Sequence, residues 1–161
     1  MYEKVSTNLN FVDREKKTEE FWKENDIFHK SMENRKEGET YTFYDGPPTA
    51  NGKPHIGHVL TRVIKDMIPR YRTMKGYEVP RKAGWDTHGL PVELGVEKAL
   101  HITKEDIGKT ISVAEYNAAC RKDVMKFTKE WTDLTHKMGY WVDLENPYIT
   151  YDNRYIETLW W

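Results

Sequence analysis

Two histidines on either side of a glycine are the residues of this 161-residue chain best placed for chemistry. His55 and His58 follow a turn-rich segment at 45–52, and a helix is expected to begin near Gly57. The start of a helix favours an anion, because its free N–H groups and its dipole point toward the ligand. Each imidazole can also donate an N–H to a phosphate oxygen. The pattern therefore predicts a nucleotide site, in which Gly57, lacking a Cβ, lets a flat adenine approach the backbone.

Each of these features also has a purely structural explanation. His55 and His58 could cap the helix or lie at the surface. The segment lacks both G-x-x-x-x-G-K-[ST] and G-x-G-x-x-G, which excludes two common phosphate-binding loops. Positions 62–82 contain seven Lys and Arg but only two acidic residues. These basic residues could attract phosphates or form a solvated helix face. Cys120 lies on an apolar stripe, so it is expected to fill the core rather than act as a nucleophile.

The elements that must position the histidines are expected in the middle of the chain. Tyr-Thr-Phe-Tyr at 41–44 predicts a strand that the following turn ends. Apolar spacing predicts a helix over 57–75, kinked at Pro69 and closed at Gly76. A second strand is expected at 77–84. Together these segments predict two parallel strands joined through a helix.

The flanking regions are expected to be plain helices. A charged helix is predicted over 12–28, and a single long helix over 112–139. The long helix starts at a capping box formed by Ser112 and Glu115. Asp152 is expected to cap a final helix.

Composition narrows the class of protein. Charged residues make up 32% of the chain and hydrophobic residues 38%, with a net charge of −1, which is typical of a folded chain with a small core. No apolar run is long enough for a membrane span, and the N-terminus lacks a signal-peptide core. A single cysteine excludes an internal disulfide framework and a multi-cysteine zinc site. We expect a cytosolic protein, cut from something larger.

Two blocks of sequence resemble a known family. His55-Ile56-Gly57-His58 resembles the HIGH signature of the class I aminoacyl-tRNA synthetases, and 48–58 meet the longer pattern P-x-x-x-G-x-x-H-x-G-H. The block GWDTHGLPVE at 84–93 resembles the isoleucyl branch more than the leucyl or valyl relatives. Segments 140–143, 148–150 and 155–161 are similar to the same branch. The resemblance runs from about Asn8 to the end of the chain.

The resemblance implies a reaction and a set of site residues. Isoleucine would be activated with ATP to isoleucyl-adenylate and then transferred to tRNA(Ile). The isoleucine carboxylate would attack the α-phosphorus, while His55 and His58 act as catalytic groups that stabilise the phosphates. Pro47 would line the isoleucine side chain, and Asp86 would bind the α-ammonium. The implied ATP site comprises Thr49, Asn51, His55, Gly57 and His58. Without the resemblance, Asp86 is explained equally well as the N-cap of a helix at 89–100.

The implied fold is α/β, the N-terminal half of a Rossmann-like class I synthetase catalytic domain with accessory helices. Residues 1–40 would form an N-terminal helical extension, and 41–161 the first part of that domain, ending before the editing insertion. Mg²⁺ would arrive with ATP, and no zinc or other metal would be bound by this segment. The parent protein would be monomeric and cytoplasmic, binding isoleucine, ATP and tRNA(Ile) but no membrane.

Two other functions stay open. Because the chain lacks a KMSKS-like signature, it is expected to be inactive alone, and it could be a folding or binding piece. It could also be a stand-alone nucleotidyltransferase that shares only the HIGH signature, although the block at 84–93 argues against this.

Overall fold

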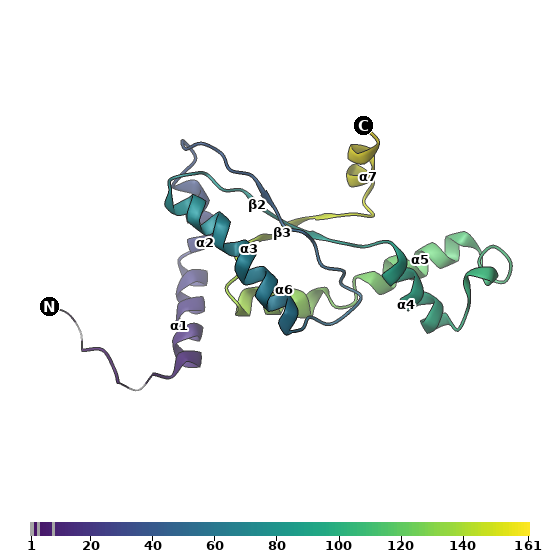
Figure 1. The fold of residues 1–161 in the computed structure, drawn as a ribbon, viewed down its shortest axis with the longest axis horizontal. Coiled ribbons are helices and arrows are strands. Elements are labelled where there is room, and N and C mark those ends of the chain that lie inside the picture. The colour runs from purple at the N-terminus through teal and green to yellow at the C-terminus, as the bar shows by residue number, and fades with distance from the viewer. Residues whose placement is uncertain (1, 3, 8) are drawn as a thin grey trace.

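A parallel three-stranded sheet, in the order β1-β2-β3, runs through the middle of the molecule (Figure 1). The computed structural model describes residues 2, 4–7 and 9–161. Strand β1 (Phe43–Tyr44) pairs with β2 (Arg81–Trp85), and β2 pairs with β3 (Asp143–Ile149). The two predicted strands are therefore confirmed as parallel partners but are shorter than expected, and β3 was not predicted. Positions 1, 3 and 8, which belong to the expected N-terminal extension and the start of the resemblance, lie outside the described residues.

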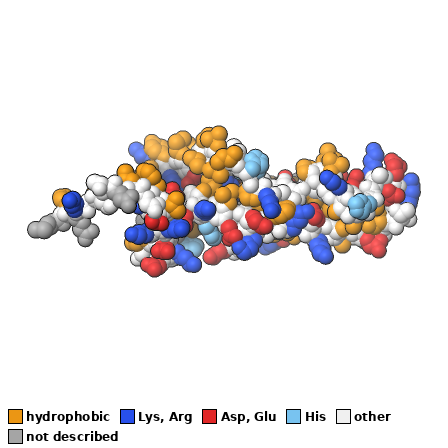
Figure 2. All heavy atoms as spheres, turned by 90° about the horizontal axis from the view of Figure 1, so that it is seen from below, with side chains coloured by type: hydrophobic (Ala, Val, Ile, Leu, Met, Phe, Trp, Pro, Cys, Tyr) orange, Lys and Arg blue, Asp and Glu red, His pale blue; other side chains and the backbone are white. Residues whose placement is uncertain are grey.

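Helix α3 (Ile56–Met74) connects β1 to β2, as parallel pairing requires a crossover. The predicted helix is confirmed, and Pro69 lies within it without ending it. The residues that α3 buries are Arg62, Asp66, Pro69 and Thr73, three of them polar. Hydrophobic side chains gather instead on the solvent side of α3 (Figure 2). These exposed residues are Ile56, Leu60, Val63, Ile64, Met67, Ile68, Tyr71 and Met74.

The N-terminal region contains two helices where one was expected. Helix α1 (Phe11–Glu24) ends before Asp26, whose φ of 49° is left-handed and breaks the helical path, and α2 (Ile27–Glu33) follows. Both helices pack on the same indole, because the ring centroids of Trp22 and Phe28 lie 5.1 and 6.1 Å from that of Trp141. The N-terminal helices are thus attached just before β3.

The single helix expected over 112–139 is also two helices. Helix α5 (Val113–Val124) and helix α6 (Thr128–Lys137) are separated by a turn. The break has a tertiary cause, since the Phe127 N–H donates to the Ala50 carbonyl oxygen at 3.1 Å rather than within a helix. The predicted capping box at the start of α5 is present, and Asp152 caps α7 (Asn153–Trp160) as expected.

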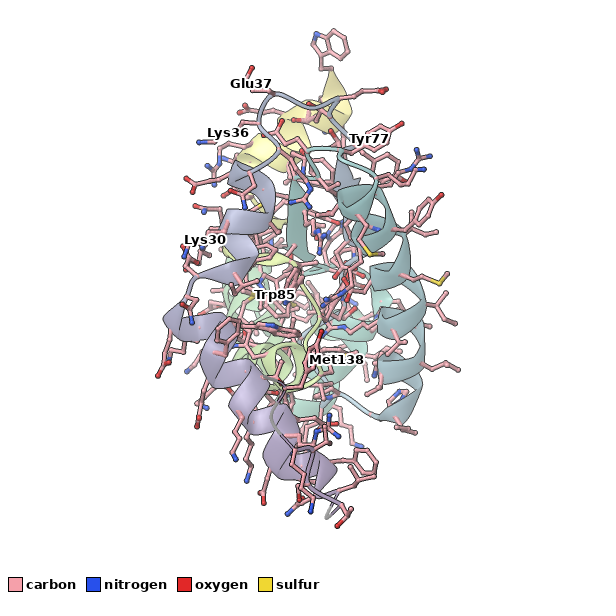
Figure 3. The ribbon with its side chains drawn as sticks, turned by 90° about the vertical axis from the view of Figure 1, so that its left-hand side faces the viewer. Lys30, Lys36, Glu37, Tyr77, Trp85 and Met138 are labelled. Carbon is pink, nitrogen blue, oxygen red and sulfur yellow. The ribbon has the colours of Figure 1, made fainter. Side chains whose placement is uncertain are left out.

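The core lies against the sheet in two small clusters. One contains Ala50, Trp85 and Trp131, and the other contains Ala83, Tyr140 and Val142. Figure 3 shows Trp85 and Met138 in the middle of the molecule, while Lys30, Lys36 and Glu37 lie on its outside. Helix α4 (Leu90–Leu100) packs on α5 beyond the sheet, with the short 3₁₀ helix η1 (Lys104–Asp106) between them in the chain. Within the described part of the chain, no helix has the length and apolarity needed to cross a bilayer.

Candidate active site

Two segments that carry residues predicted to bind the amino acid meet where the chain leaves β1 and β2. The Asp86 N–H donates to the Pro48 carbonyl oxygen at 3.0 Å, and Thr49 Oγ1 donates to Asp86 Oδ2 at 3.2 Å. Thr49 and Asp86 also form an isolated parallel bridge, which continues the pairing of the two strands. Pro47 lies two residues before this bridge. The structure therefore brings the turn at 47–49 and Asp86 together at the carboxyl ends of parallel strands, where α/β proteins commonly bind ligands.

The alternative role of Asp86 as a helix N-cap is wrong. Helix α4 begins after Gly89, and no side chain caps it. Asp86 lies three residues earlier and directs its Oδ2 atom to Thr49. Among residues 2, 4–7 and 9–161, no hydrogen bond reaches Asp86 Oδ1. The carboxylate is thus held at one oxygen, and the other can accept a bond from a ligand cation.

His55 and His58 cap the first turn of α3, as their structural explanation expected. The Gly57 N–H donates to Nδ1 of His55 at 3.2 Å, and the His55 N–H donates to Nδ1 of His58 at 3.1 Å. A backbone N–H can only donate, so each Nδ1 is the acceptor and each Nε2 carries the proton in the neutral ring. Capping therefore fixes the tautomer and leaves both Nε2–H groups as donors. The structural and the chemical interpretations use different nitrogens and do not compete.

Gly57 makes room for one of these rings. A Cβ built on Gly57 would lie 3.0 Å from Cε1 and 3.1 Å from Nδ1 of His55. The two imidazole centroids are 3.8 Å apart, so both rings lie over the first turn of α3. A larger residue at position 57 would displace the His55 ring and weaken the cap.

Trp131 connects the histidines with the core. Its ring lies edge-on to the His58 ring, with a centroid distance of 4.6 Å, and its Nε1–H donates to the Gly52 carbonyl oxygen at 2.8 Å. Burial, together with the nearby His55 and Arg62, lowers the pKa of His58 below its usual value of 6.5. His58 is therefore neutral at pH 7, which preserves the tautomer that the cap selects. The apolar spacing in 112–139 indicated Trp131 as a core residue, but not its contact with His58.

Asn51 links the loop before α3 to helix α4. Its Nδ2 atom donates to the Pro91 carbonyl oxygen in the first turn of α4 at 3.0 Å. The segment between Thr49 and His55 is thereby held by α4 at Asn51 and by α6 at Gly52. Except for Asp86, the predicted site residues lie on one continuous segment, which runs from the turn at Pro47 to His58 in the first turn of α3.

Two of the seven basic residues in 62–82, Arg62 and Arg81, are buried, and a solvated face does not describe them. Arg62 is 5% exposed, donates to Thr135 Oγ1 and lies 4.8 Å from the Trp131 ring centroid. The Arg81 side chain is inaccessible to solvent, and burial lowers the pKa of its guanidinium to about 10. Lys65 forms an ion pair with the buried Asp45, a residue that the sequence indicated only as part of a turn. The basic stretch is therefore largely structural.

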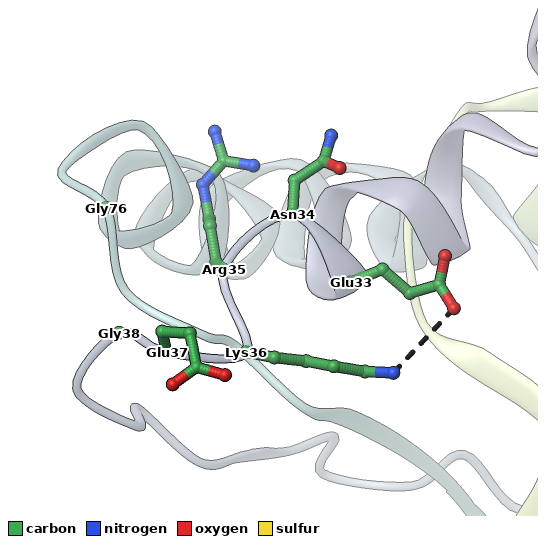
Figure 4. Close-up of a pocket in the computed structure, with 7 residues that line it drawn as sticks. All are labelled: Glu33, Asn34, Arg35, Lys36, Glu37, Gly38 and Gly76. Atoms are coloured by element: carbon green, nitrogen blue, oxygen red, sulfur yellow. Dashed lines mark ion pairs between the residues drawn. The ribbon is translucent and has the colours of Figure 1, made fainter.

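Two further polar features of the structure were not predicted as parts of the site. His88, which was not assigned to the site, forms a hydrogen bond of 2.7 Å with Thr150 Oγ1. A hollow of about 670 Å³ lies between α2 and the turn after α3, where Lys36 and Glu33 form an ion pair of 3.8 Å (Figure 4). No predicted site residue lines this hollow. Its lining residues are Glu33, Asn34, Arg35, Lys36, Glu37, Gly38 and Gly76.

Comparisons with known proteins agree on a family and a fold. Residues 17–161 match the family described as class I tRNA synthetases (I, L, M and V). The chain is 74% identical over 140 residues to the isoleucine–tRNA ligase of Bacteroides fragilis, covering 87% of the chain and 12% of that protein. It is 55% identical over 161 residues to the isoleucine–tRNA ligase of Clostridium novyi, covering 100% of the chain and 16% of that protein. The chain thus spans a small part of the relatives that it matches.

A solved structure supports the fold independently. The LeuRS of Agrobacterium radiobacter K84, in a ternary complex with tRNA and LeuAMS, superposes with a TM-score of 0.60 at 20% identity, covering 91% of the chain and 17% of that protein. At this identity the likeness concerns the fold alone. Together with the family match, it confirms the predicted α/β fold of a class I synthetase.

Proposed function

The chain belongs to the class I tRNA synthetases, and from this premise we propose that it is the part of an isoleucine–tRNA ligase that binds isoleucine and one side of ATP. Its high identity with isoleucine–tRNA ligases supports the choice of amino acid. The observation that carries the proposal is the position of Asp86, whose carboxylate is held by Thr49 beside Pro47 instead of capping α4. Asp86 binds the α-ammonium of isoleucine, and Pro47 contacts its side chain.

The histidines act at the other end of the substrates. The isoleucine carboxylate attacks the α-phosphorus of ATP, and pyrophosphate leaves. Nε2–H of His55 and of His58 donates to phosphate oxygens, and these bonds strengthen as negative charge develops in the transition state. Thr49, Asn51 and Gly57 contact ATP along the loop that leads to α3. The capping bonds at Nδ1 hold both rings in place beforehand, which lowers the cost of orienting them.

The proposal extends to the parent protein. Helices α1 and α2 belong to an N-terminal extension that ends at residue 40, and 41–161 form the first part of the catalytic domain. Mg²⁺ reaches the site on the ATP phosphates, and in the described part of the chain no three His, Cys, Asp or Glu side chains gather into a metal site. The parent is a monomeric cytoplasmic enzyme that binds tRNA(Ile), and this chain alone does not complete the reaction.

Binding to the chain itself is the first test. Calorimetric titration with a non-hydrolysable isoleucyl-adenylate mimic is compared with the valyl and leucyl mimics. Saturable binding that prefers the isoleucyl mimic, and that Asp86→Asn weakens, supports the proposed pocket. Equal binding of all three mimics would contradict the assignment of isoleucine.

Catalysis is tested in a chimera in which this chain replaces the 161 aligned residues of the Clostridium novyi enzyme. We expect isoleucine-dependent exchange of pyrophosphate into ATP. His58→Gln keeps an acceptor for the capping box, and it is expected to lower kcat by about 10²–10³-fold, as loss of a transition-state donor does. Asp86→Asn keeps the partner of Thr49 but removes the charge, and it should raise the KM for isoleucine by about tenfold or more while the KM for ATP stays nearly constant.

Two results would refute the proposal. Exchange that depends on a substrate other than isoleucine would favour a different nucleotidyltransferase. An equal rise in both KM values in Asp86→Asn would show that Asp86 supports the whole loop rather than the amino acid.

A further inference from the structure

Four hydrogen bonds hold the turn that carries Pro47. The Asp45 N–H donates to the Lys82 carbonyl oxygen of β2 at 2.8 Å, and the Pro48 carbonyl oxygen accepts from Asp86 at 3.0 Å. Between these points, the carbonyl oxygens of Asp45 and Gly46 accept from side chains of other elements. Neither backbone bond explains where Gly46 and Pro47 lie, because both act at the ends of the turn.

Tyr148 of β3 supplies one of the side-chain bonds. Its hydroxyl donates to the Asp45 carbonyl oxygen at 2.5 Å. Its ring lies directly on β2, since a Cβ built on Gly84 would be 2.4 Å from two carbons of the ring. Burial and the nearby Asp45 raise the pKa of Tyr148 to about 12, so the phenol keeps the proton that it donates. Tyr155 of α7 also stacks against Tyr148, at a centroid distance of 5.8 Å and an interplanar angle of 10°.

Lys65 of α3 supplies the other bond. Its Nζ donates to the Gly46 carbonyl oxygen at 3.1 Å and forms an ion pair with Asp45, whose side chain is 2% exposed. The Tyr140 hydroxyl donates to Asp45 Oδ1 at 2.9 Å. A buried carboxylate with these two partners fixes Lys65, and Lys65 in turn fixes Gly46. The turn is therefore tied to α3 and β3 as well as to β2.

We propose that Tyr148 and Lys65 are positioning residues that set the wall of the amino-acid pocket, by holding the carbonyl groups of Asp45 and Gly46 just before Pro47. This inference rests on the proposed function, because it assigns selectivity to a pocket for isoleucine. A turn held at two successive carbonyls cannot move Pro47 toward a shorter side chain, to restore the lost contact, without breaking these bonds. Selectivity between isoleucine and valine then depends on Tyr148 of β3 and Lys65 of α3. Both act through the turn and not by touching the substrate.

The first test measures the turn without any substrate. Tyr148→Phe removes the hydroxyl and keeps the ring, and Tyr155→Phe makes the same change in its stacked neighbour as a matched control. We expect amide hydrogen exchange at Asp45 and Asp86 to be about three- to tenfold faster in Tyr148→Phe, as the loss of one hydrogen bond implies. Equal exchange in the two variants would overturn the positioning role of Tyr148.

The second test measures selectivity in the Clostridium novyi chimera. In Tyr148→Phe the KM for isoleucine should rise about three- to tenfold, with the KM for ATP changed less than about twofold and the preference over valine reduced. Gly84→Ala, which displaces the same ring, should change selectivity in the same direction. Faster amide exchange with unchanged selectivity would overturn the role in the pocket. If the unmodified chimera shows no isoleucine-dependent exchange, the proposed function fails, and the exchange rates of the chain still decide whether Tyr148 positions the turn.

Discussion

On α3, the face that packs against the rest of the chain is polar, whereas the face turned to solvent is apolar. Arg62 and Asp66 are 5% and 8% exposed, while Met67, next in the chain, is 60% exposed. The buried face bonds to several elements: Arg62 to Thr135 on α6, and Asp66 to Arg70 and to Arg81 on β2. An ordinary surface helix shows the reverse pattern.

The difference teaches that periodicity predicts a helix without predicting its orientation. The spacing of apolar residues on α3 correctly indicated helical structure over 57–75. The charges of 62–82 offered no sign of burial, because the groups that bond to them lie on other elements: Thr135 on α6, Arg81 on β2 and Asp45 just after β1. Charged residues can lie inside only where such partners satisfy them. Long-range bonds therefore decide which face of α3 is buried.

Alanine substitutions at two neighbouring positions, one on each face of α3, test this comparison most directly. Asp66→Ala leaves the buried Arg81 without its carboxylate, and we expect unfolding to become easier by about 3–5 kcal/mol, the usual cost of breaking a buried pair. Met67→Ala is the matched control on the opposite face and should change stability by less than about 0.5 kcal/mol. Urea unfolding followed by circular dichroism measures both. Equal losses in the two variants would show that α3 buries both faces.

A smaller effect is expected where the polar face meets α6. Thr135 is buried and accepts a hydrogen bond from Arg62, so Thr135→Val leaves a guanidinium N–H without this partner. We expect a loss of about 1–3 kcal/mol in the free energy of unfolding. Thr61→Val makes the same change on the exposed side of α3, where the hydroxyl donates to carbonyl oxygens of its own helix. The two variants should differ clearly in urea midpoint, and equal midpoints would contradict a structural role for the Arg62 contact.

The sequence predicts the fold best where local signals are strong. The capping box at Ser112 and Glu115, the Asp152 cap and the parallel strands around α3 all follow from short-range patterns. The two predicted long helices failed for reasons that lie elsewhere. Phe127 leaves the helix to bond with Ala50, and Asp26 adopts a left-handed conformation. Strand β3 was missed because Asn146 and Pro147 interrupt its pattern, although pairing with β2 still forms.

The candidate site shows the same division. The spacing of His55 and His58 indicated a helix start, and the structure adds that the cap selects the Nε2–H tautomer. Local chemistry allowed Asp86 to cap α4, but the helix begins only after Gly89, and the Asp86 carboxylate bonds to Thr49 instead. Asp45 and Tyr148 are separated by about a hundred residues, so no local pattern could reveal their hydrogen bond. The sequence indicated which residue types belong to the candidate site, but it did not indicate the hydrogen bonds that orient them.

The next prediction concerns His55, which caps the start of α3 and is also a predicted site residue. His55→Ala removes the N-cap acceptor, and we expect a loss of about 1 kcal/mol. His55→Asn supplies a preferred N-cap residue and should keep stability within about 0.5 kcal/mol of the unmodified chain. Thermal unfolding gives both values. In the chimera, however, His55→Asn should lower kcat for pyrophosphate exchange, because asparagine places no Nε2–H at the phosphates. Full activity in His55→Asn would show that capping is the whole role of this histidine.

The smallest expected effect compares two histidines titrated in one experiment. Burial lowers the pKa of His58 at the start of α3, while the hydrogen bond to Asp26 raises the pKa of His29 on α2. Folded His58 binds fewer protons than the unfolded chain, so its contribution makes stability fall as the pH drops below about 6.5. His29 acts in the opposite sense, since its stabilisation is complete below about 6.5 and is lost as the pH rises through its raised folded pKa.

Titration of the ring C–H signals by NMR measures the two histidines separately. We expect the pKa of His58 to lie below the ordinary value of 6.5 and that of His29 to lie above it. Asp26→Asn should return the pKa of His29 toward 6.5 and leave that of His58 unchanged, because Asp26 bonds to His29, whereas burial, His55 and Arg62 shift His58. A common midpoint for both histidines would mean that the His58 ring is as solvated as a surface residue. The contact with Trp131 would then not hold it against the core, and the neutral tautomer at the start of α3 would depend on the capping bond alone.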